Sequence, residues 1–384
     1  DGQPVKYAFD HGVLVGYTGS SLAYGQRVFE VSLDDDGTGS YTFKLLGNLD
    51  HPAGQGSNVL KLTFDYTATD SDGDSSGSTF TVTVVDDIPT IGHAESETVS
   101  ESNLPTDLYD VVFPDSPYST VQTGHLAISW GADDNDSGAT NNRSVSFFNA
   151  SAPEGLTSNG YAISYVVSAD GTTLSAVTTD HRTVFTVTLS DDSDGSYKFT
   201  LLDNLDHGKS GTDSLSLSFG FKATDSDGDS AAGSFTVAVT DDVPTVGCAE
   251  DETVSEASLP TDGYDTGHPD ASNSTVQTGS LDISWGADDN NTGVGHNRAV
   301  AFTTGAGATG LTSDGSAISY TISGDGTLLT AVTADHRTVF TIQLSDSGDG
   351  SYKFTLYDNI DHPASGSNDD SLPLTFGFKA TDSD

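Results

Sequence analysis

The chain is built from long internal repeats. The segment STVQTGHLAISWGADDN at 119–135 returns as STVQTGSLDISWGADDN at 274–290, and the segment at 180–207 returns at 335–362 with few changes. Trp130 and Trp285 stand 155 residues apart, and Asp225 and Asp382 stand 157 apart. Any fold for this sequence must therefore be assembled from copies of one long unit.

This spacing predicts three repeats. Residues 1–88 are the C-terminal part of a first unit, residues 89–243 form a complete second unit, and residues 244–384 form a third unit that lacks its last strand. The boundaries lie at VVDDIPT (84–90) and VTDDVPT (239–245), where Pro89 and Pro244 stiffen the linkers. Because the sequence begins with Asp1 and contains no Met, we expect it to be an internal piece of a larger protein.

Each unit is predicted to be all-β. In TVFTVTL, Phe185, Val187 and Leu189 alternate with threonines, which is the period of a half-buried strand. Units of this length are too long for a solenoid rung or a propeller blade, and long enough to bury their own cores. Several such runs per unit, with turn signals between them, favour tandem immunoglobulin-like or cadherin-like β-sandwich domains arranged as beads on a string.

The charge limits the possible partners. The sequence has 57 Asp and Glu residues against 13 Lys and Arg residues, a formal net charge of −44. Nucleic acid is a poor partner for such a chain, because phosphate binding needs clustered Lys and Arg. Cys248 is the only cysteine, so no intrachain disulfide can form, and bound metal is one candidate for another staple. No signal peptide or transmembrane run is visible in the sequence.

Acidic elements recur at the predicted ends of the units. The loop ATDSDGDS occupies 68–75 and 223–230, and its first five residues return at 380–384. The strand before this loop runs away from the next unit, so the loop should face the preceding unit, where the linker aspartates enter. The loop SDDSDGSY (190–197) and Glu101 are expected to reach the same region. Four acidic elements are thus predicted to converge on each junction between units.

Carboxylates held this close repel one another, and a divalent cation with six to eight oxygen ligands relieves the repulsion. Calcium tolerates irregular oxygen geometry better than magnesium, and one Cys without paired His at ligand spacing argues against zinc. The loop is not an EF-hand, because Ser75 and Thr81 stand where that motif needs Gly and Glu. The predicted calcium ligands are Asp70, Asp72, Asp74, Asp86, Asp87, Glu101, Asp191, Asp192, Asp194, Asp225, Asp227, Asp229, Asp241, Asp242, Glu256, Asp346, Asp349, Asp382 and Asp384.

Two interpretations of the acidic residues stay open beside this one. The segment WGADDND (130–136) is a further candidate for cation binding. Alternatively, Asp, Ser and Gly are ordinary turn residues, and the acidic loops are merely solvated.

The order of the motifs resembles a known family. The motifs VSE, LP, G-x-L, W and D come first, then DGSY-x-F-x-L and LDH, then ATDSDGD and FTV followed by the linker DD and its proline, across essentially the whole chain. This order is similar to the extender repeats of giant type I secreted adhesins of Gram-negative bacteria, often called RTX adhesins. The resemblance implies a calcium-binding, immunoglobulin-like stalk at the bacterial cell surface that holds an adhesive tip away from the cell.

The family's calcium residues carry over to the linker pairs Asp86–Asp87 and Asp241–Asp242 and to the loops at 70–74 and 225–229. The glycine-rich nonapeptide repeats of the family's secretion signal are absent from this sequence. Type I secretion is therefore implied by the resemblance alone. The expected partners are neighbouring repeats of the same chain.

Other functions remain as alternatives. An enzyme could use Asp180, His181 and Arg182, which recur at 335–337, but the first unit has no His at that place and active sites are seldom duplicated in tandem. We therefore predict that the chain is not an enzyme. A self-associating extracellular filament or biofilm matrix, in which other copies are the partners, would need apolar patches or open strand edges.

A carbohydrate-binding module could stack Trp130 and Trp285 on sugar rings, although a sandwich core is the more usual place for Trp. The His of LDH recurs as His51, His207 and His362. We interpret it as a polar group that fixes the end of a strand rather than as a metal ligand.

Overall fold

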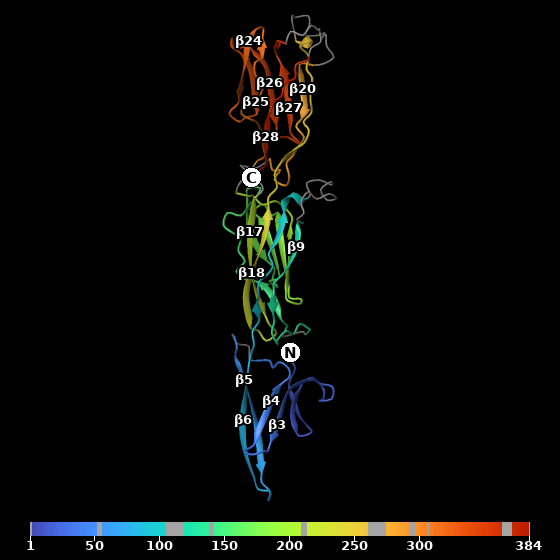
Figure 1. Cartoon of the computed structure of the whole chain (residues 1–384), viewed down its shortest axis with the longest axis vertical. Coiled ribbons are helices and arrows are strands. Elements are labelled where there is room, and N and C mark those ends of the chain that lie inside the picture. Colours follow the sequence, from blue (N-terminus) through green and yellow to red (C-terminus); the bar gives the residue numbers. More distant parts are fainter. Residues whose placement is uncertain are drawn as a thin grey trace.

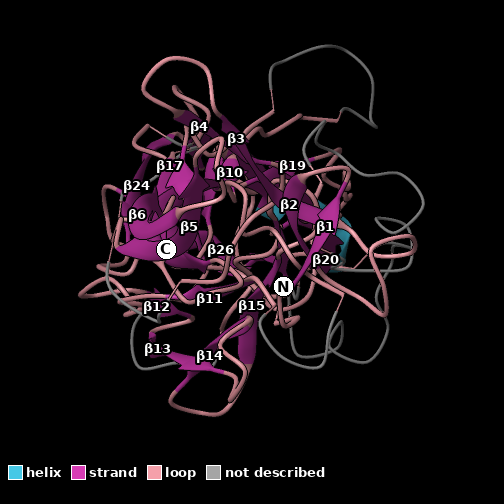
Figure 2. Ribbon diagram, turned by 90° about the horizontal axis from the view of Figure 1, so that it is seen from below, coloured by secondary structure: helices cyan, strands magenta, loops and turns pink. Residues whose placement is uncertain are grey.

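The computed structural model describes residues 2–51, 56–104, 119–137, 142–208, 213–259, 274–291, 297–305, 307–362 and 371–383. Its strands fall into three groups that follow one another along the long axis of the molecule (Figure 1). We call these groups unit 1 (β1–β6), unit 2 (β7–β18) and unit 3 (β19–β28). The view from below shows strands and loops with very little helix (Figure 2). The prediction of an all-β sandwich fold is confirmed.

Unit 2 is a sandwich of two main sheets. The larger has the strand order β12-β13-β14-β15-β16-β9, the smaller has the order β11-β17-β18-β8, and β10 pairs with β7. The elements are β7 (Thr90–Ile91), β8 (Glu97–Ser100), the 3-10 helix η1 (Glu101–Asn103), β9 (Val121–His125), β10 (Ile128–Ser129), β11 (Ser144–Phe147), β12 (Thr157–Ser158), β13 (Tyr161–Val167), β14 (Thr173–Thr178), β15 (Thr183–Ser190), β16 (Ser196–Leu201), β17 (Ser214–Thr224) and β18 (Ser230–Thr240).

The core of unit 2 lies between these sheets. Alternate residues of β15 and β16 point inward, so that Phe185, Val187 and Phe199 are fully buried, as the period of two dictates. The rings of Phe219 and Phe235 come from the facing sheet and stack with centroids 5.3 Å apart. Aromatic side chains of this size dominate the energy of such a core.

Unit 3 repeats this plan. Its larger sheet has the order β20-β27-β26-β25-β24-β23, while β22 pairs with β28 and β19 with β21. The elements are β19 (Thr245–Val246), the 3-10 helix η2 (Glu256–Ser258), β20 (Val276–Ser280), β21 (Ile283–Ser284), β22 (Ala299–Phe302), β23 (Thr312–Ser313), β24 (Ser316–Ile322), β25 (Leu328–Thr333), β26 (Thr338–Ser345), β27 (Ser351–Leu356) and β28 (Phe378–Thr381).

Unit 1 has a sheet of order β1-β2-β3-β4 and the long hairpin β5-β6. Its buried core is smaller and is built around Phe29, Val31 and Leu49. The strands are β1 (Lys6–Asp10), β2 (Val13–Tyr17), β3 (Arg27–Asp34), β4 (Ser40–Leu45), β5 (Val59–Thr69) and β6 (Ser75–Val85).

The hairpin β17–β18 connects the two ends of unit 2. Eleven residue pairs join its strands, from Ser214 opposite Thr240 to Thr224 opposite Ser230. The turn at 225–229 faces unit 1, as the direction of the strands predicts, and the far end of β18 leads into the linker to unit 3. Strand β8 lies parallel to β18, with Ser100 beside Thr240, so Glu101 is carried to the end of unit 2 that faces unit 3.

Candidate metal centres at the unit junctions

Side chains from both neighbours line the contact between units 1 and 2, which we call the first junction. Its residues come from unit 1, from the linker and from two loops of unit 2: Asn48, His51, Asp86, Asp87, Asp133, Asp225, Asp227 and Asp229.

The turn 225–229 is shaped by its first aspartate. Asp225 Oδ1 accepts hydrogen bonds from the backbone N–H groups of Gly228 (3.0 Å) and Asp229 (2.7 Å). This fold of the loop turns Asp229 toward unit 1, where its Oδ1 accepts a hydrogen bond from Gly56 N–H at 3.0 Å. The second oxygens, Oδ2 of Asp225 and of Asp229, are buried and accept no hydrogen bond from the described residues.

The linker is fixed by its second aspartate. Asp87 Oδ2 accepts a hydrogen bond from Ala132 N–H at 2.8 Å. Gly131 has φ +76°, and a Cβ atom at this position would lie 1.8 Å from Asp87 Oδ2, so only glycine permits this contact. The sequence WGADD is thus a docking loop for the linker.

A side-chain hydrogen bond also crosses the first junction. Asn48 Nδ2 of unit 1 donates to Asp133 Oδ1 of unit 2 at 2.9 Å. Asp133 is 2% exposed, and its carbonyl accepts from Ser226 N–H at 3.0 Å, which joins the docking loop to the 225–229 turn. Of the acids in WGADDND, Asp133 is the one that reaches the junction.

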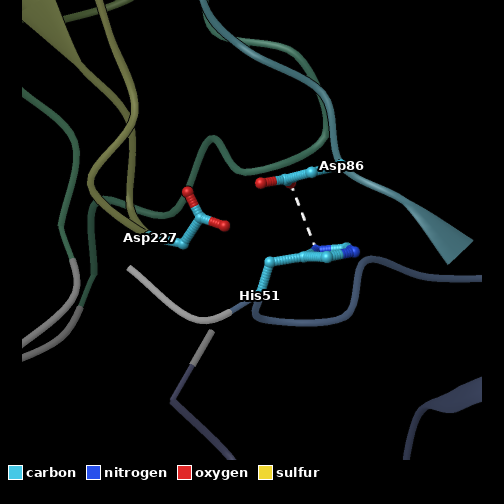
Figure 3. A group of neighbouring side chains, drawn as sticks. All are labelled: His51, Asp86 and Asp227. Atoms are coloured by element: carbon cyan, nitrogen blue, oxygen red, sulfur yellow. Dashed lines mark ion pairs between the residues drawn. The ribbon is translucent and has the colours of Figure 1, made fainter. Parts of the chain in front are cut away.

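His51, Asp86 and Asp227 meet at the centre of the first junction (Figure 3). His51 Nδ1 lies 3.2 Å from Asp86 Oδ1, and the two side chains are 3% and 1% exposed. One ligand atom of each of the three residues lies within 4.8 Å of the others. Burial, together with the charge of Asp227, raises the pKa of Asp86 to about 6, and burial together with contact to Asp227 raises the pKa of Asp225 to about 7.

The second junction, between units 2 and 3, repeats these contacts with equivalent residues. Asp242 Oδ2 accepts from Ala287 N–H at 2.9 Å, and Gly286, at φ +73°, leaves room for it. Asn204 Nδ2 donates to Asp288 Oδ1 at 2.5 Å. The Asp288 carbonyl accepts from Ser383 N–H at 3.0 Å, which places the loop after β28 at this junction.

Glu101 adds a carboxylate to the second junction. It is fully buried, and its Oε1 accepts a hydrogen bond from Leu205 N–H at 2.6 Å. Its Oε2 lies 3.4 Å from His207 Nε2. Single oxygens of Glu101, Asp241, Asp242 and Asp288 all lie within 4.8 Å of one another, and all four residues are buried. Burial raises the pKa of Glu101 to about 7, against the opposing effect of His207.

His207 at the second junction is enclosed by acids. Its Nδ1 lies 2.6 Å from Asp213 Oδ1, while Nε2 faces Glu101. Burial acts to lower its pKa, but hydrogen bonding to Glu101 and the charges of Glu101 and Asp241 outweigh burial and raise the pKa of His207 to about 9. The acids around His207 therefore favour its protonated form.

The structure separates the predicted ligands into two groups. Those brought to a junction are Asp86, Asp87, Asp225, Asp227, Asp229, Glu101, Asp241, Asp242 and Asp382. The expectation that Glu101 lies beside Asp86 and Asp87 is wrong, because the parallel pairing of β8 with β18 carries it to the opposite end of unit 2.

The second group lies away from the two junctions. Asp70, Asp72 and Asp74 are exposed but lie close enough together to hold an ion. The loop with Asp191, Asp192 and Asp194 is at the predicted end of unit 2, yet it contacts His125, Ile128 and Trp130 instead of the linker. Asp346 and Asp349 lie in the equivalent loop of unit 3, where the Asp349 carbonyl accepts a hydrogen bond from Ile283 N–H. Glu256 pairs with His362 at the far end of unit 3, and Asp384 lies outside the described residues.

The Trp and Arg side chains considered as functional candidates from the sequence have structural roles. Trp130 is 5% exposed, its indole N–H donates to the Ser193 carbonyl at 2.8 Å, and Arg143 covers the ring. The interpretation as a core Trp is confirmed, and this ring is not open for stacking on a sugar. Arg182 pairs with Asp180 and Asp203 and also donates to the Ser158 carbonyl, so its charge is used to brace a turn.

Sequence reasoning missed the contributions of Asn48, Asn204, His51 and His207. The signal for them was present in the repeated NLDH, which stands before each linker. Its partners are not visible from the sequence, because they lie far along the chain. The asparagines donate to an aspartate of the next unit, and the histidines face Asp86 and Glu101.

Among the described residues, no helix has the length and apolar character needed to span a membrane. No family model matches the chain, and no curated protein is detectably similar to it.

Proposed function

We propose that this chain is a cation-stiffened segment of the stalk of a giant extracellular adhesin, a structural element rather than an enzyme. The observation that carries the proposal is the repetition of one acidic junction. Asn48 and Asn204, Asp87 and Asp242, and Asp133 and Asp288 make equivalent contacts at two successive boundaries. A contact rebuilt at every boundary serves the geometry of the row of units.

The junctions need positive charge. Two unit charges about 4 Å apart repel by roughly 4 kcal/mol at an effective dielectric of about 20. Glu101, Asp241, Asp242 and Asp288 bring four buried carboxyl groups together. Four carboxyl groups of the first junction contain buried oxygens without a hydrogen-bond donor among the described residues: Asp86, Asp225, Asp227 and Asp229. Protons or cations must balance this charge in the folded state.

The donor set of the second junction fits calcium. Calcium binds carboxylate oxygens at roughly 2.3–2.6 Å, so oxygens around one ion stand at most about 5 Å apart. The four oxygens within 4.8 Å of one another meet this limit. Bound calcium would supply the balancing charge, and Asp241, Asp242, Glu101 and Asp288 would be held together by it.

A bound cation would stiffen the second junction because its carboxylate ligands come from different parts of the chain. Asp241 and Asp242 belong to the linker, Glu101 to unit 2 and Asp288 to unit 3. Without a cation these groups repel, and the linker is free to bend. With one, both units and the linker share a single set of ligands. Binding to the folded junction alone also stabilises it by about 4 kcal/mol at a thousandfold excess over Kd.

The resemblance to adhesin extender repeats suggests where a stalk of this kind would act. In such a setting it would lie outside a Gram-negative cell, reach that place by type I secretion, and hold an adhesive tip away from the surface.

Small-angle scattering of the chain in millimolar calcium and then in excess chelator tests the proposal. We expect a rod whose maximum dimension shortens on average, with signs of flexibility, when calcium is removed. An identical profile in both conditions would contradict it and would leave the acidic groups as solvated or protonated side chains.

A further inference from the structure

The first junction contains a histidine whose ring nitrogen points at carboxylates. The side chain of His51 is 3% exposed, and Nδ1 lies with one oxygen each of Asp86 and Asp227 in a group within 4.8 Å (Figure 3). These residues come from three separate segments: the end of unit 1, the linker and the 225–229 turn of unit 2.

The other ring nitrogen of His51 lies beside a backbone carbonyl. Nε2 is 3.4 Å from the Val84 carbonyl oxygen, which can only accept a hydrogen bond. Nδ1 makes no hydrogen bond with the described residues and lies 3.2 Å from Asp86 Oδ1, so it is the ring nitrogen that an ion held by the carboxylates would meet. A ring with one nitrogen against a backbone carbonyl and the other directed at acids is arranged as metal-binding histidines are.

The second junction provides the contrast. Both ring nitrogens of His207 already face carboxylates, Nδ1 at 2.6 Å from Asp213 Oδ1 and Nε2 at 3.4 Å from Glu101 Oε2. Asp213 is one of those carboxylates, and its carbonyl accepts the N–H of the linker residue Asp241. In unit 1 the carbonyl that accepts the N–H of Asp86 belongs to Asn58 instead. The two histidines thus have different surroundings, with an acid at position 213 of unit 2 and an amide at the equivalent position 58 of unit 1.

We propose that the first junction binds a divalent transition metal of the zinc class through His51 Nδ1, Asp86 and Asp227, whereas the second junction takes an oxygen-only cation such as calcium. Imidazole with carboxylates is a donor set for zinc, and nitrogen ligands disfavour calcium. Two ligand atoms about 2.0 Å from a tetrahedral zinc ion stand roughly 3.3 Å apart. The observed Nδ1–Oδ1 distance is 3.2 Å. The fourth ligand would be a water molecule or Asp229, whose carboxyl group lies close enough to Asp86 to raise its pKa.

This inference rests on the proposed cation-bound junctions and specifies the metal class at one of them. The sequence argues against zinc only because no paired ligands lie close together along the chain. Here the fold gathers positions 51, 86 and 227. The rod would then be fastened at successive joints by different metals and would respond to zinc and calcium independently.

The test uses the whole metal-free chain near neutral pH with millimolar calcium present throughout. Zinc is titrated calorimetrically, and cobalt(II) is titrated by visible absorption. We expect one zinc per chain that calcium does not displace, and a four-coordinate cobalt spectrum. His51→Gln should weaken zinc binding by more than roughly tenfold, whereas the matched variant His207→Gln should leave it unchanged. Asp227→Asn, at a half-exposed position, should also weaken it.

Zinc-edge X-ray absorption of the unmodified chain provides a readout that does not depend on folding of a variant. An imidazole nitrogen in the zinc shell supports the inference, and a shell of oxygens alone overturns it. Zinc affinity that is equal in His51→Gln and the unmodified chain also overturns it.

The inference and the stalk proposal fail separately. If zinc does not bind but calcium still lengthens the rod, the first junction is an ordinary calcium joint and the stalk proposal stands. If zinc binds through His51 while calcium leaves the scattering unchanged, the zinc site stands and calcium stiffening fails.

Discussion

The octapeptide ATDSDGDS stands in two settings in this molecule. At 68–75 every residue is exposed, whereas at 223–230 the turn lies against unit 1, and Asp225 and Asp229 are 2% and 3% exposed. The local structure is the same in both: Gly73 and Asp74 N–H groups donate to Asp70 Oδ1 at 3.2 and 3.0 Å, as the equivalent groups donate to Asp225.

The pKa of the first aspartate shifts in opposite directions in the two copies. Hydrogen bonding with Asp72, and then with the loop backbone, holds the pKa of Asp70 below its ordinary value, whereas burial raises the pKa of Asp225 to about 7. Glu101 and Glu256 form a similar pair, with side chains 0% and 36% exposed. The sequences match, so the neighbouring unit causes the difference. The junction creates the site, and the loop alone does not.

The largest expected effect is the loss of folding stability when the buried Glu101 is removed, compared with the loss when the exposed counterpart Glu256 is removed. Glu101→Ala removes the carboxylate that faces His207 Nε2 and accepts the Leu205 N–H group in the interior, which we expect to cost unit 2 about 3–5 kcal/mol. Glu256→Ala removes a half-exposed pair and should cost unit 3 less than about 1 kcal/mol.

Urea unfolding followed by Trp fluorescence measures both. Trp130 reports on unit 2 in a Trp285→Phe background, and Trp285 reports on unit 3 in the reverse background. Equal losses from the two Glu variants would contradict the claim that the neighbouring unit makes Glu101 important.

The two copies of the octapeptide allow a matched test of stiffness. Asp225→Ala with Asp227→Ala removes two carboxylates from the first junction and should loosen it in millimolar calcium while both sandwiches stay folded. Asp70→Ala with Asp72→Ala makes the same change in the exposed copy and should leave the scattering profile as it was. A double variant at 225 and 227 that keeps the full length of the rod would show that this turn does not fasten the joint.

Some of these features could be predicted from the sequence and others could not. The alternation in β15 and β16 and the repeat were enough to predict sandwich units in series, and strand direction was enough to place Asp225 at the joint with unit 1. The parallel pairing of β8 with β18 was not predictable from hairpins, so Glu101 was placed at the wrong end. His51 was missed as a junction residue, because burial beside Asp86 and Asp227 is a property of two units together.

The pH dependence of the metal-free chain should follow the raised pKa values. Burial raises the pKa of Asp86 to about 6 and of Glu101 to about 7, as it does for Asp225. The folded state thus holds protons that the unfolded chain has released, and its stability falls as pH rises from about 4 to 7. The pKa of His207, raised to about 9, adds stability that is complete below about 6.5 and is lost as pH rises through 9.

Thermal unfolding in chelator across this range checks the sign. Calcium replaces the protons, so the fall between pH 4 and 7 should shrink when calcium is present. Asp225→Asn should flatten the metal-free curve and Asp70→Asn should not, which separates the junction from the general repulsion of a chain with net charge −44. A metal-free chain that grows more stable toward pH 7 would contradict the raised values.

The smallest expected effect concerns the hydrogen bond that crosses the first junction. Asn48→Ala removes the donor to Asp133 Oδ1 and leaves a buried carboxylate oxygen without it, which should cost about 1–3 kcal/mol. That loss should appear only when units 1 and 2 are docked, because Asn48 and Asp133 belong to different sandwiches. The counterpart Asn359 lies at the end of unit 3, where the described residues include no acceptor from a further unit, so Asn359→Ala should change stability little. Hydrogen exchange of the Ala132 and Ser226 amides, which lie on either side of Asp133, measures docking directly. Faster exchange in Asn48→Ala but not in Asn359→Ala would tie the asparagine to the joint, and equal exchange in both would mean that the linker aspartates hold the joint without it.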